Sequence, residues 1–157
     1  MVSEPIIQLS GVRKSYGNGK AQQQVLRGVS LEVRAGEMVA MVGQSGSGKS
    51  TLLNIVGGLD RPDAGTIRVN GRMYSDLDDR ELALLRNRSI GFVFQQFHLL
   101  DHLSVAENVE LPSFFARPVE DARVAAIHAL ERVGLSDFVD RRPGELPTVL
   151  LEDPVPF

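Results

Sequence analysis

The most specific chemical pattern in the sequence is a run of eight residues, Gly43-Gln44-Ser45-Gly46-Ser47-Gly48-Lys49-Ser50. It fits G-x-x-x-x-G-K-[S/T], and a chain of this length matches that pattern by chance in roughly one case in a hundred or fewer. Glycines lack a Cβ, so consecutive backbone N–H groups can approach phosphate oxygens closely. Lys49 can then reach β- and γ-phosphates, and the Ser50 hydroxyl can bind Mg²⁺. The pattern predicts a phosphate-binding loop.

The elements on either side of this loop fit the same chemistry. Met38–Val42 is continuously apolar, which predicts a strand covered on both faces in a parallel sheet. Residues Ser50–Val56 predict a helix that ends at Gly57-Gly58, and its positive N-terminal end would face the loop. The alternative is a glycine turn with an unrelated lysine, which gives no reason for a strand and a helix in these places.

The remaining strand signals indicate an α/β domain with an antiparallel layer at its start. Ile6–Val12 and Val25–Val33 alternate apolar and polar residues around the turn cluster 17–19. Thr66–Val69 runs into the tight turn Asn70-Gly71, and Ile90–Phe94 predicts a second buried strand. Strands therefore alternate with helices after the first two, as in α/β proteins.

Helix signals are local and specific. Asp78 with Glu81, and Ser104 with Glu107, have the spacing of capping boxes, and the first predicts a helix to about Asn87. Pro118–Val133 predicts a longer helix stopped by Gly134, and its inward residues are expected to be Ala126, Ile127, Leu130 and Val133.

Composition excludes several classes of function. The 157 residues carry a net charge of −3 and no cysteine. No basic excess supports a nucleic-acid partner, and disulfides and thiolate chemistry are excluded. The longest apolar runs are about five residues, against roughly 20 for a membrane span, and the N-terminus is not a secretory signal. We expect a cytoplasmic location.

The segment that contains the loop, 41–54 (MVGQSGSGKSTLLN), and three segments after it resemble the ATP-binding subunits of ABC transporters in order and spacing: 59–65 (LDRPDAG), 90–95 (IGFVFQ) and 103–109 (LSVAENV). The resemblance covers roughly residues 5–146 and is greatest for the lipoprotein-release and macrolide-export branch. It implies a P-loop NTPase fold with an N-terminal antiparallel β layer, and ATP with Mg²⁺ as cofactors. It also implies an inner-membrane permease subunit as partner, a second ATP-binding subunit, and a location peripheral to the inner membrane.

The resemblance assigns roles to individual residues. Tyr16 would stack on adenine, with a half-buried strand tyrosine as the alternative, and Gln95 would contact Mg²⁺ or the attacking water near the permease. Gln96 is the alternative if the register is one residue off. The metal-binding residues would be Ser50 and Gln95. The nucleotide-binding set would be Tyr16, Gly43, Gln44, Ser45, Gly46, Ser47, Gly48, Lys49, Ser50, Thr51 and Gln95.

After Leu146 the sequence departs from the family pattern. Pro147 follows where the family continues into S-G-G-Q, and Glu152-Asp153-Pro154 reverses the usual Asp-Glu order after the short apolar run 148–151. A deletion and a frameshift both explain this ending. We expect a partial ATP-binding domain over 1–146 and an aberrant tail over 147–157. The later core strands and the signature helix would be missing, so an apolar face beside the loop's own strand would be exposed.

Three functions compete on this evidence. The first is an ATP-binding subunit, or a remnant of one, that energises transport; it contains none of the family's catalytic residues and would bind Mg-ATP without turnover. The second is a small P-loop kinase, which would need an arginine-rich lid that does not follow Gln95. The third is a non-catalytic module that occupies a permease through Gln95 and the region Leu99–Phe115.

Overall fold

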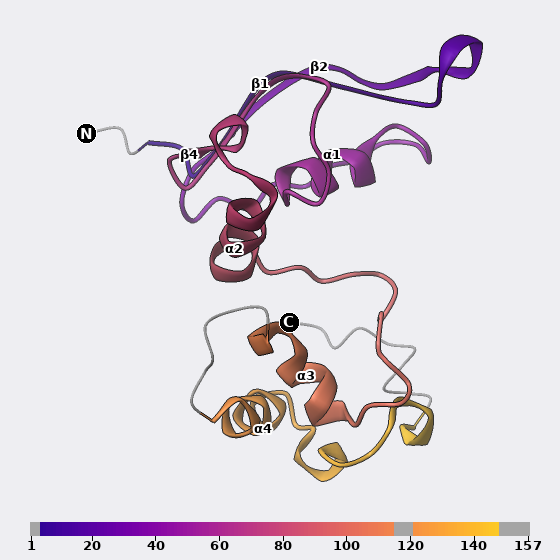
Figure 1. The fold of residues 1–157 in the computed structure, drawn as a ribbon, viewed down its shortest axis with the longest axis vertical. Helices are drawn as coiled ribbons and strands as arrows, with labels where there is room; N and C mark the ends of the chain where they lie inside the picture. Colours follow the sequence, from indigo (N-terminus) through magenta and orange to yellow (C-terminus); the bar gives the residue numbers. More distant parts are fainter. Residues whose placement is uncertain (1–3, 115–120, 148–157) are drawn as a thin grey trace. The chain divides into compact units, whose positions relative to one another are not determined.

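The computed structural model describes residues 4–114 and 121–147 (Figure 1). The chain forms two compact units, Met1–Gly91 and Phe92–Phe157, and each is described by itself. The elements of the first unit are β1 (Ile7–Tyr16), η1 (Gly19–Ala21), β2 (Gln23–Val33), α1 (Lys49–Val56), β3 (Ala64–Val69), β4 (Arg72–Met73), η2 (Tyr74–Asp76) and α2 (Asp79–Ser89). Those of the second are α3 (Val105–Phe114), α4 (Ala122–Arg132), η3 (Ser136–Phe138) and η4 (Pro143–Glu145).

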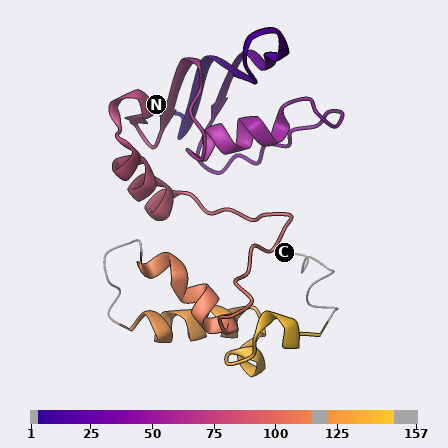
Figure 2. The ribbon, with the colours of Figure 1, turned by 45° about the vertical axis from the view of Figure 1, so that its right-hand side comes forward.

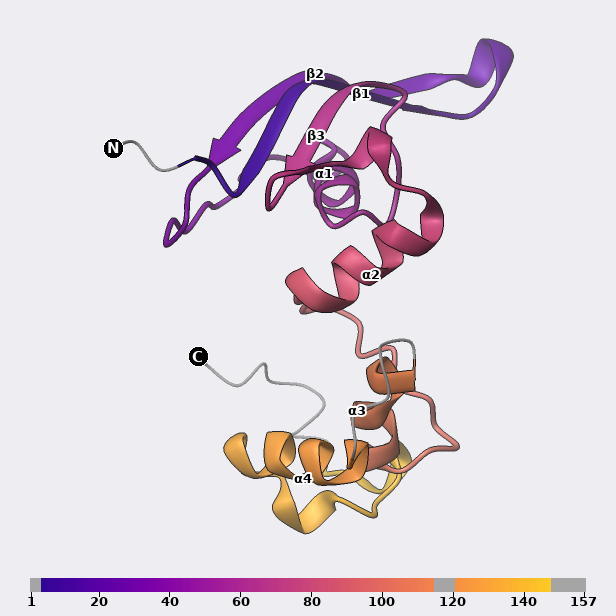
Figure 3. The same ribbon diagram turned by 60° about the vertical axis from the view of Figure 1, so that its left-hand side comes forward.

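The first unit is an antiparallel sheet with a helix against one face. The strand order is β2-β1-β3-β4, which confirms the predicted antiparallel layer. α1 lies against the sheet (Figures 2 and 3). Leu9 and Val12 of β1 are both buried because the register shifts between them, and the helix contributes Leu52 and Ile55, which is fully buried. These side chains share one hydrophobic core, so α1 and the loop before it are fixed to the sheet.

The register of β3 against β1 depends on a close backbone approach. Gly65 has a φ of +89°, and a Cβ built on it would lie 2.6 Å from the carbonyl oxygens of Ser10 and Gly11. Only glycine fits this position, because a methyl group would meet rigid backbone.

We therefore expect Gly65→Ala to lower the free energy of unfolding by about 2–4 kcal/mol, since backbone strain and a steric clash add. Gly71→Ala is the matched control: Gly71 also has a positive φ, +75°, but a Cβ there would have no neighbour within 4 Å. It should cost about 1 kcal/mol. Chemical denaturation of both variants checks the difference, and equal losses would contradict the close approach of β3 to β1.

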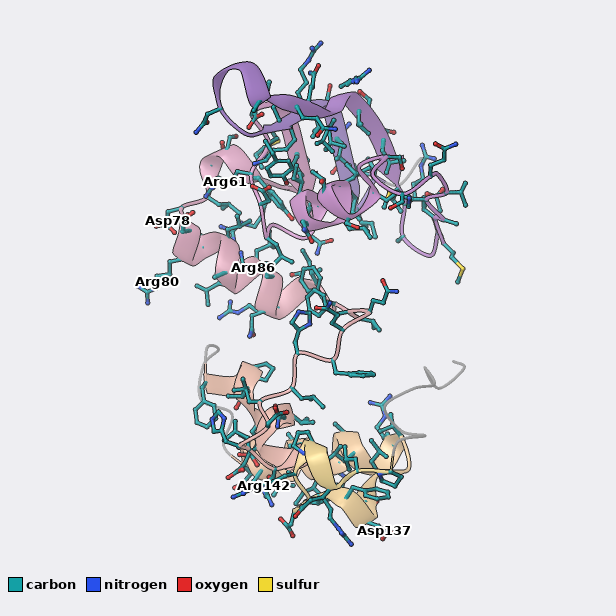
Figure 4. The ribbon with its side chains drawn as sticks, turned by 90° about the vertical axis from the view of Figure 1, so that its right-hand side faces the viewer. Arg61, Asp78, Arg80, Arg86, Asp137 and Arg142 are labelled. Atoms are coloured by element: carbon teal, nitrogen blue, oxygen red, sulfur yellow. The ribbon has the colours of Figure 1, made fainter. Side chains whose placement is uncertain are left out.

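Polar side chains fix the C-terminal end of α1. The buried Tyr74 donates a hydrogen bond from its hydroxyl to the Val56 carbonyl at 2.5 Å, and Arg86 donates to the Gly58 carbonyl at 2.7 Å. Burial raises the pKa of Tyr74 to about 12. Arg61 donates to the Tyr74 carbonyl at 3.2 Å, so η2, α2 and the end of α1 are joined (Figure 4). Carbonyls without an intrahelical partner are satisfied here, and the C-terminal end of α1 is held in place.

Local sequence signals correspond to the observed geometry. Asp78 accepts from the Glu81 backbone at 2.7 Å, and Glu81 accepts from the Asp78 backbone at 3.1 Å, so the capping box is confirmed. α2 continues two residues beyond the predicted Asn87. Asn70 and Gly71 both have positive φ, 47° and 75°, and join β3 to β4 in the predicted tight turn.

The two predicted buried strands are wrong. Met38–Val42 and Ile90–Phe94 have no regular structure, and Met38, Val42 and Val93 expose 99%, 93% and 87% of their surface. A strand covered on both faces needs a neighbouring strand for its backbone groups, and within the described residues neither segment has one. Because the sequence leaves the family pattern after Leu146, we expected exposed apolar surface beside the loop. Met38–Val42, which precedes the loop, has such a surface.

The second unit is a small helical layer. Val105, Ala106 and Leu130 form its core. The predicted pair Ser104 and Glu107 is confirmed, with reciprocal hydrogen bonds of 3.2 and 2.7 Å. Asn108 donates to the Leu100 and Ser104 carbonyls at 3.1 and 2.9 Å and accepts from the Leu100 N–H at 2.8 Å, which closes the loop before α3.

The predicted helix Pro118–Val133 corresponds to α4, of which the described part begins at Ala122. Ala126 and Leu130 are buried as predicted, and Ile127 is half-buried. Val133 is 56% exposed, so its inward placement is wrong, because α4 ends one residue earlier at Arg132.

The tail predictions lie outside the described residues. They concern the apolar run 148–151 and the carboxylates Glu152 and Asp153 of the aberrant tail. Within the ranges 4–114 and 121–147, no helix has both the length and the apolar character to cross a bilayer.

Candidate functional site

The predicted phosphate-binding loop is an exposed turn that leads directly into α1. Ser47 donates a backbone hydrogen bond to the Gln44 carbonyl at 3.2 Å, which curves the loop. Gly48 begins the helix in the left-handed region, with φ at 92°, and a Cβ there would lie 3.0 Å from the Leu26 side chain and 3.3 Å from the Val25 carbonyl. The last glycine of the pattern is required, because it lets the start of α1 pack against β2.

Lys49 is hydrogen-bonded inside the loop itself. Its half-buried side chain donates from Nζ to the Gly43 carbonyl at 2.8 Å, the Gln44 carbonyl at 2.7 Å and the Ser47 Oγ at 3.3 Å. These contacts use the three donors of the ammonium group and hold it within the curve of the loop. A positive charge is thus placed where the sequence pattern expects phosphate oxygens.

The N-terminal end of α1 has groups that suit an anion. Gly48 offers no side-chain acceptor to the first N–H groups, and the first turn of the helix contains no acidic residue. The positive end of the helix is therefore not neutralised by the chain's own carboxylates in that turn. Ser50 is exposed and Thr51 half-buried at the same end. These groups fit a phosphate.

The described residues of the site offer Mg²⁺ one hydroxyl ligand rather than a preformed set of protein ligands. In the described part of the chain, no three histidine or carboxylate side chains gather as metal ligands. The Ser50 hydroxyl is a hard oxygen ligand, which suits Mg²⁺ when substrate phosphates supply further oxygens. The residues present therefore fit Mg²⁺ bound together with a phosphate ligand.

Tyr16 lies at the end of β1 with 44% of its surface exposed. Its hydroxyl donates to Asp60 Oδ2 at 2.7 Å, and the Thr51 side chain interacts with the same hydroxyl. Part of the ring is accessible, and its stacking on adenine stays a prediction, with a half-buried strand tyrosine as the alternative. The structure thus brings Tyr16 to the first turn of α1.

The strand register places Tyr16 close to the loop. Lys14 of β1 is paired with Leu26 of β2, and the Leu26 side chain is the one that Gly48 approaches. Thr51, in the first turn of α1, interacts with the Tyr16 hydroxyl, so Tyr16 lies near the start of the helix. A common nucleotide site of Tyr16 and residues 43–51 stays a prediction.

Known proteins share this geometry. A family model described as "ABC transporter" matches residues 26–150. The chain belongs to the ABC transporter family.

Curated relatives of this ABC chain include export proteins. The macrolide export ATP-binding/permease protein MacB 1 of Aeromonas hydrophila is 50% identical over 144 residues, which cover 91% of this chain and 22% of the relative. MacB of Salmonella typhimurium is 51% identical over 142 residues, with 90% and 22% coverage. The chain therefore spans about a fifth of the length of these relatives.

A solved ABC cassette has the same fold. MJ0796, in a dimeric post-hydrolysis state bound to ADP and Pi, superposes with a TM-score of 0.80 at 41% identity. The match covers 90% of this chain and 63% of the MJ0796 chain. The P-loop ABC fold is shown over this part, together with its antiparallel N-terminal sheet.

Gln95 belongs to the second unit of this ABC chain. It lies in a bend and is exposed, as is Gln96. Phe92 and Phe94 stack just before it, with centroids 5.4 Å apart. Its role at Mg²⁺ stays a prediction.

Sequence reasoning missed Asp60 as a part of the site. Asp60 follows α1 and contacts Tyr16 across 44 sequence positions, so no local pattern reveals the pair. The alternation of side chains along β1 does place Lys14 and Tyr16 on one face of the strand. This was the sequence signal that these two side chains lie close together.

Proposed function

We propose that this chain is the ATP-binding part of an ABC transporter of the macrolide-export type and that it binds Mg-ATP at residues 43–51. The observation that carries the proposal is Lys49, whose ammonium group is held within the loop, directly before a helix start that has no carboxylate in its first turn. The related MJ0796 cassette is bound to ADP and Pi, which supports a nucleotide as the ligand of this chain.

Each residue of the site has a role in this binding mode. Backbone N–H groups of 43–50 bind phosphate oxygens, and Lys49 moves its donors from the loop carbonyls to the β- and γ-phosphates. The Ser50 hydroxyl, with Gln95 as the predicted second group, binds the metal. Mg²⁺ would neutralise phosphate charge when bound. Tyr16 offers its ring to the base.

The proposed partners follow from the relatives. The MacB proteins are named ATP-binding/permease proteins, and the MJ0796 cassette is dimeric. We assign this chain an inner-membrane permease as partner and a second ATP-binding domain, and thus a place at the cytoplasmic side of that membrane.

A direct binding experiment tests the proposal. Fluorescent ATP analogue is titrated into the purified 157-residue chain with Mg²⁺ and with a chelator, and unlabelled ATP, GTP and inorganic triphosphate compete. We expect saturable binding that Mg²⁺ strengthens and ATP displaces. A folded chain that binds neither ATP nor triphosphate would refute the proposal.

Tyr16→Ala is expected to weaken ATP binding while sparing inorganic triphosphate. Stacking of an aromatic ring on a base contributes about 1–3 kcal/mol in nucleic-acid complexes, so the dissociation constant for ATP should rise about 5- to 150-fold. The competition titration measures both ligands. If Tyr16→Phe is as damaging as Tyr16→Ala, the ring face contributes nothing beyond the hydroxyl, and the stacking role is wrong.

A further inference from the structure

A compact network of charges surrounds the Tyr16 side chain. Asp60 accepts hydrogen bonds from Lys14 Nζ at 2.6 Å on Oδ1 and from the Tyr16 hydroxyl at 2.7 Å on Oδ2. Lys14 Nζ also donates to the Arg61 carbonyl at 2.7 Å and lies 5.2 Å from the centroid of the Tyr16 ring. One carboxylate thus bridges the cation and the phenol of two residues on the same strand face.

These contacts fix the ring in two ways. The hydroxyl is held at its tip by Asp60, and the ammonium group of Lys14 lies over one face at a cation–π distance. The exposed fraction of Tyr16, 44%, shows that the ring is not buried by this arrangement. A ring fixed at its tip and covered on one face by a cation has one face available for a flat ligand.

The network is well enough shielded to act as a unit. The side chains of Lys14 and Asp60 expose only 12% and 29% of their surface. Burial would raise the pKa of Asp60, but hydrogen bonds from Lys14, Tyr16 and the Arg61 N–H outweigh it and lower that pKa. For Tyr16, the hydrogen bond to Asp60 is the largest cause of its raised pKa, followed by burial. Asp60 is therefore ionised and Tyr16 protonated at neutral pH, which maintains the contact.

We propose that Asp60, together with Lys14, is a positioning group for base recognition, which holds the Tyr16 ring beside the start of α1 with one face open to adenine. The proposal rests on the function proposed above. Asp60 and Lys14 do not touch the base in this arrangement; they act through Tyr16. A ring that is already held in place loses less conformational freedom when a base binds.

The connection also links base and phosphate recognition. Asp60 lies four residues after the end of α1, and its N–H and that of Leu59 donate to the Asn54 carbonyl at 3.3 and 2.8 Å. Asp60 is thus fixed to the C-terminal end of α1, while Lys14 and Tyr16 belong to the sheet. The carboxylate therefore joins the strand that carries Tyr16 to the helix whose first residues belong to the proposed phosphate site.

Tyr16→Phe, Asp60→Ala and the double variant test the proposal in the full 157-residue chain. Affinities for ATP and for inorganic triphosphate are measured by competition titration, and folding by thermal melting. Each single variant should weaken ATP about two- to tenfold, as expected for one lost hydrogen bond, and should leave triphosphate within about twofold. The double variant should be no weaker than Asp60→Ala alone, because both changes remove the same contact.

Asp76→Ala is the matched control. Asp76 is an exposed carboxylate on η2 that accepts from the Ser75 hydroxyl at 2.9 Å. Its removal changes the net charge by the same amount and leaves the contacts of Lys14 and Tyr16 in place, so the ratio of ATP to triphosphate affinity should stay at the parent value. A purely structural Asp60 would instead weaken both ligands equally, or would weaken ATP independently of Tyr16→Phe, and either result overturns the proposal.

Failure of this inference is distinguishable from failure of the proposed function. If the parent binds ATP in a Lys49-dependent way but Tyr16→Phe leaves ATP affinity unchanged, the positioning role is wrong and nucleotide binding stands. If the parent binds no triphosphate ligand, the function itself is wrong. Tyr16→Phe removes only one hydroxyl from an exposed side chain, so it gives a result even if Asp60→Ala does not fold.

Discussion

Lys49→Ala is expected to abolish detectable nucleotide binding, with a loss of at least about a hundredfold in affinity for ATP and for triphosphate alike. In the proposed binding mode the ammonium group is the main side-chain partner of several phosphate charges, and charge-assisted hydrogen bonds of this kind are the strong ones. Its removal also leaves the Gly43 and Gln44 carbonyls without the donor that now binds them.

The measurement is the fluorescent-analogue titration with folded protein. Arg80→Ala is the control, since Arg80 is an exposed cation on α2 (Figure 4) and its loss changes the net charge equally. Equal binding by the parent and Lys49→Ala would show that residues 43–50 are a turn without a ligand.

The purified 157-residue chain is expected to show no ATP turnover. Residues 43–51 and Mg²⁺ can bind the ground state, but interactions that are equal in substrate and transition state do not raise the chemical rate. Hydrolysis also needs a positioned water and charge stabilisation on the transferring phosphoryl group. The resemblance implies that those groups lie in segments that follow S-G-G-Q, and residues 1–157 contain no S-G-G-Q.

Steady-state phosphate release with Mg-ATP measures the ATP turnover of the purified chain. The parent is compared with Lys49→Ala and with the double variant Glu152→Gln, Asp153→Asn, which removes the two remaining candidate carboxylates. Placement errors of about 1 Å cost roughly a hundredfold in rate, so two carboxylates next to Pro154 are not expected to suffice. Activity that disappears in both variants would show that the tail is catalytic. Phosphotransfer to an added acceptor would favour the kinase alternative.

The sequence predicts those features that depend on short-range physics. The capping box of Asp78 with Glu81 and the Asn70-Gly71 turn need only neighbouring residues to form, and both occur as expected. The loop before α1 is also predictable, because its glycines and Lys49 have fixed spacing and the helix start follows directly.

Other features depend on partners far away in the chain. Met38–Val42 has the composition of a buried strand, but composition does not supply the neighbouring strand that would bind its backbone. Tyr16 was expected to offer only its ring, while its hydroxyl contacts Asp60 across 44 positions. Val133 continues the apolar spacing of α4 but lies beyond the last helical residue, so it does not face inward.

The exposed segment Met38–Val42 has a practical consequence for the isolated chain. Met41 packs against the core, but Met38, Val39 and Val42 are exposed, and the five apolar residues contain no charge or proline and lie outside the described sheet. Such a segment pairs readily with a second copy of itself in an extended conformation, and this leads to aggregation at high protein concentration. Solubility of the chain, rather than its affinity for ATP, therefore sets the upper concentration at which the binding experiments are interpretable, and a lysine in place of Val42 should raise that limit.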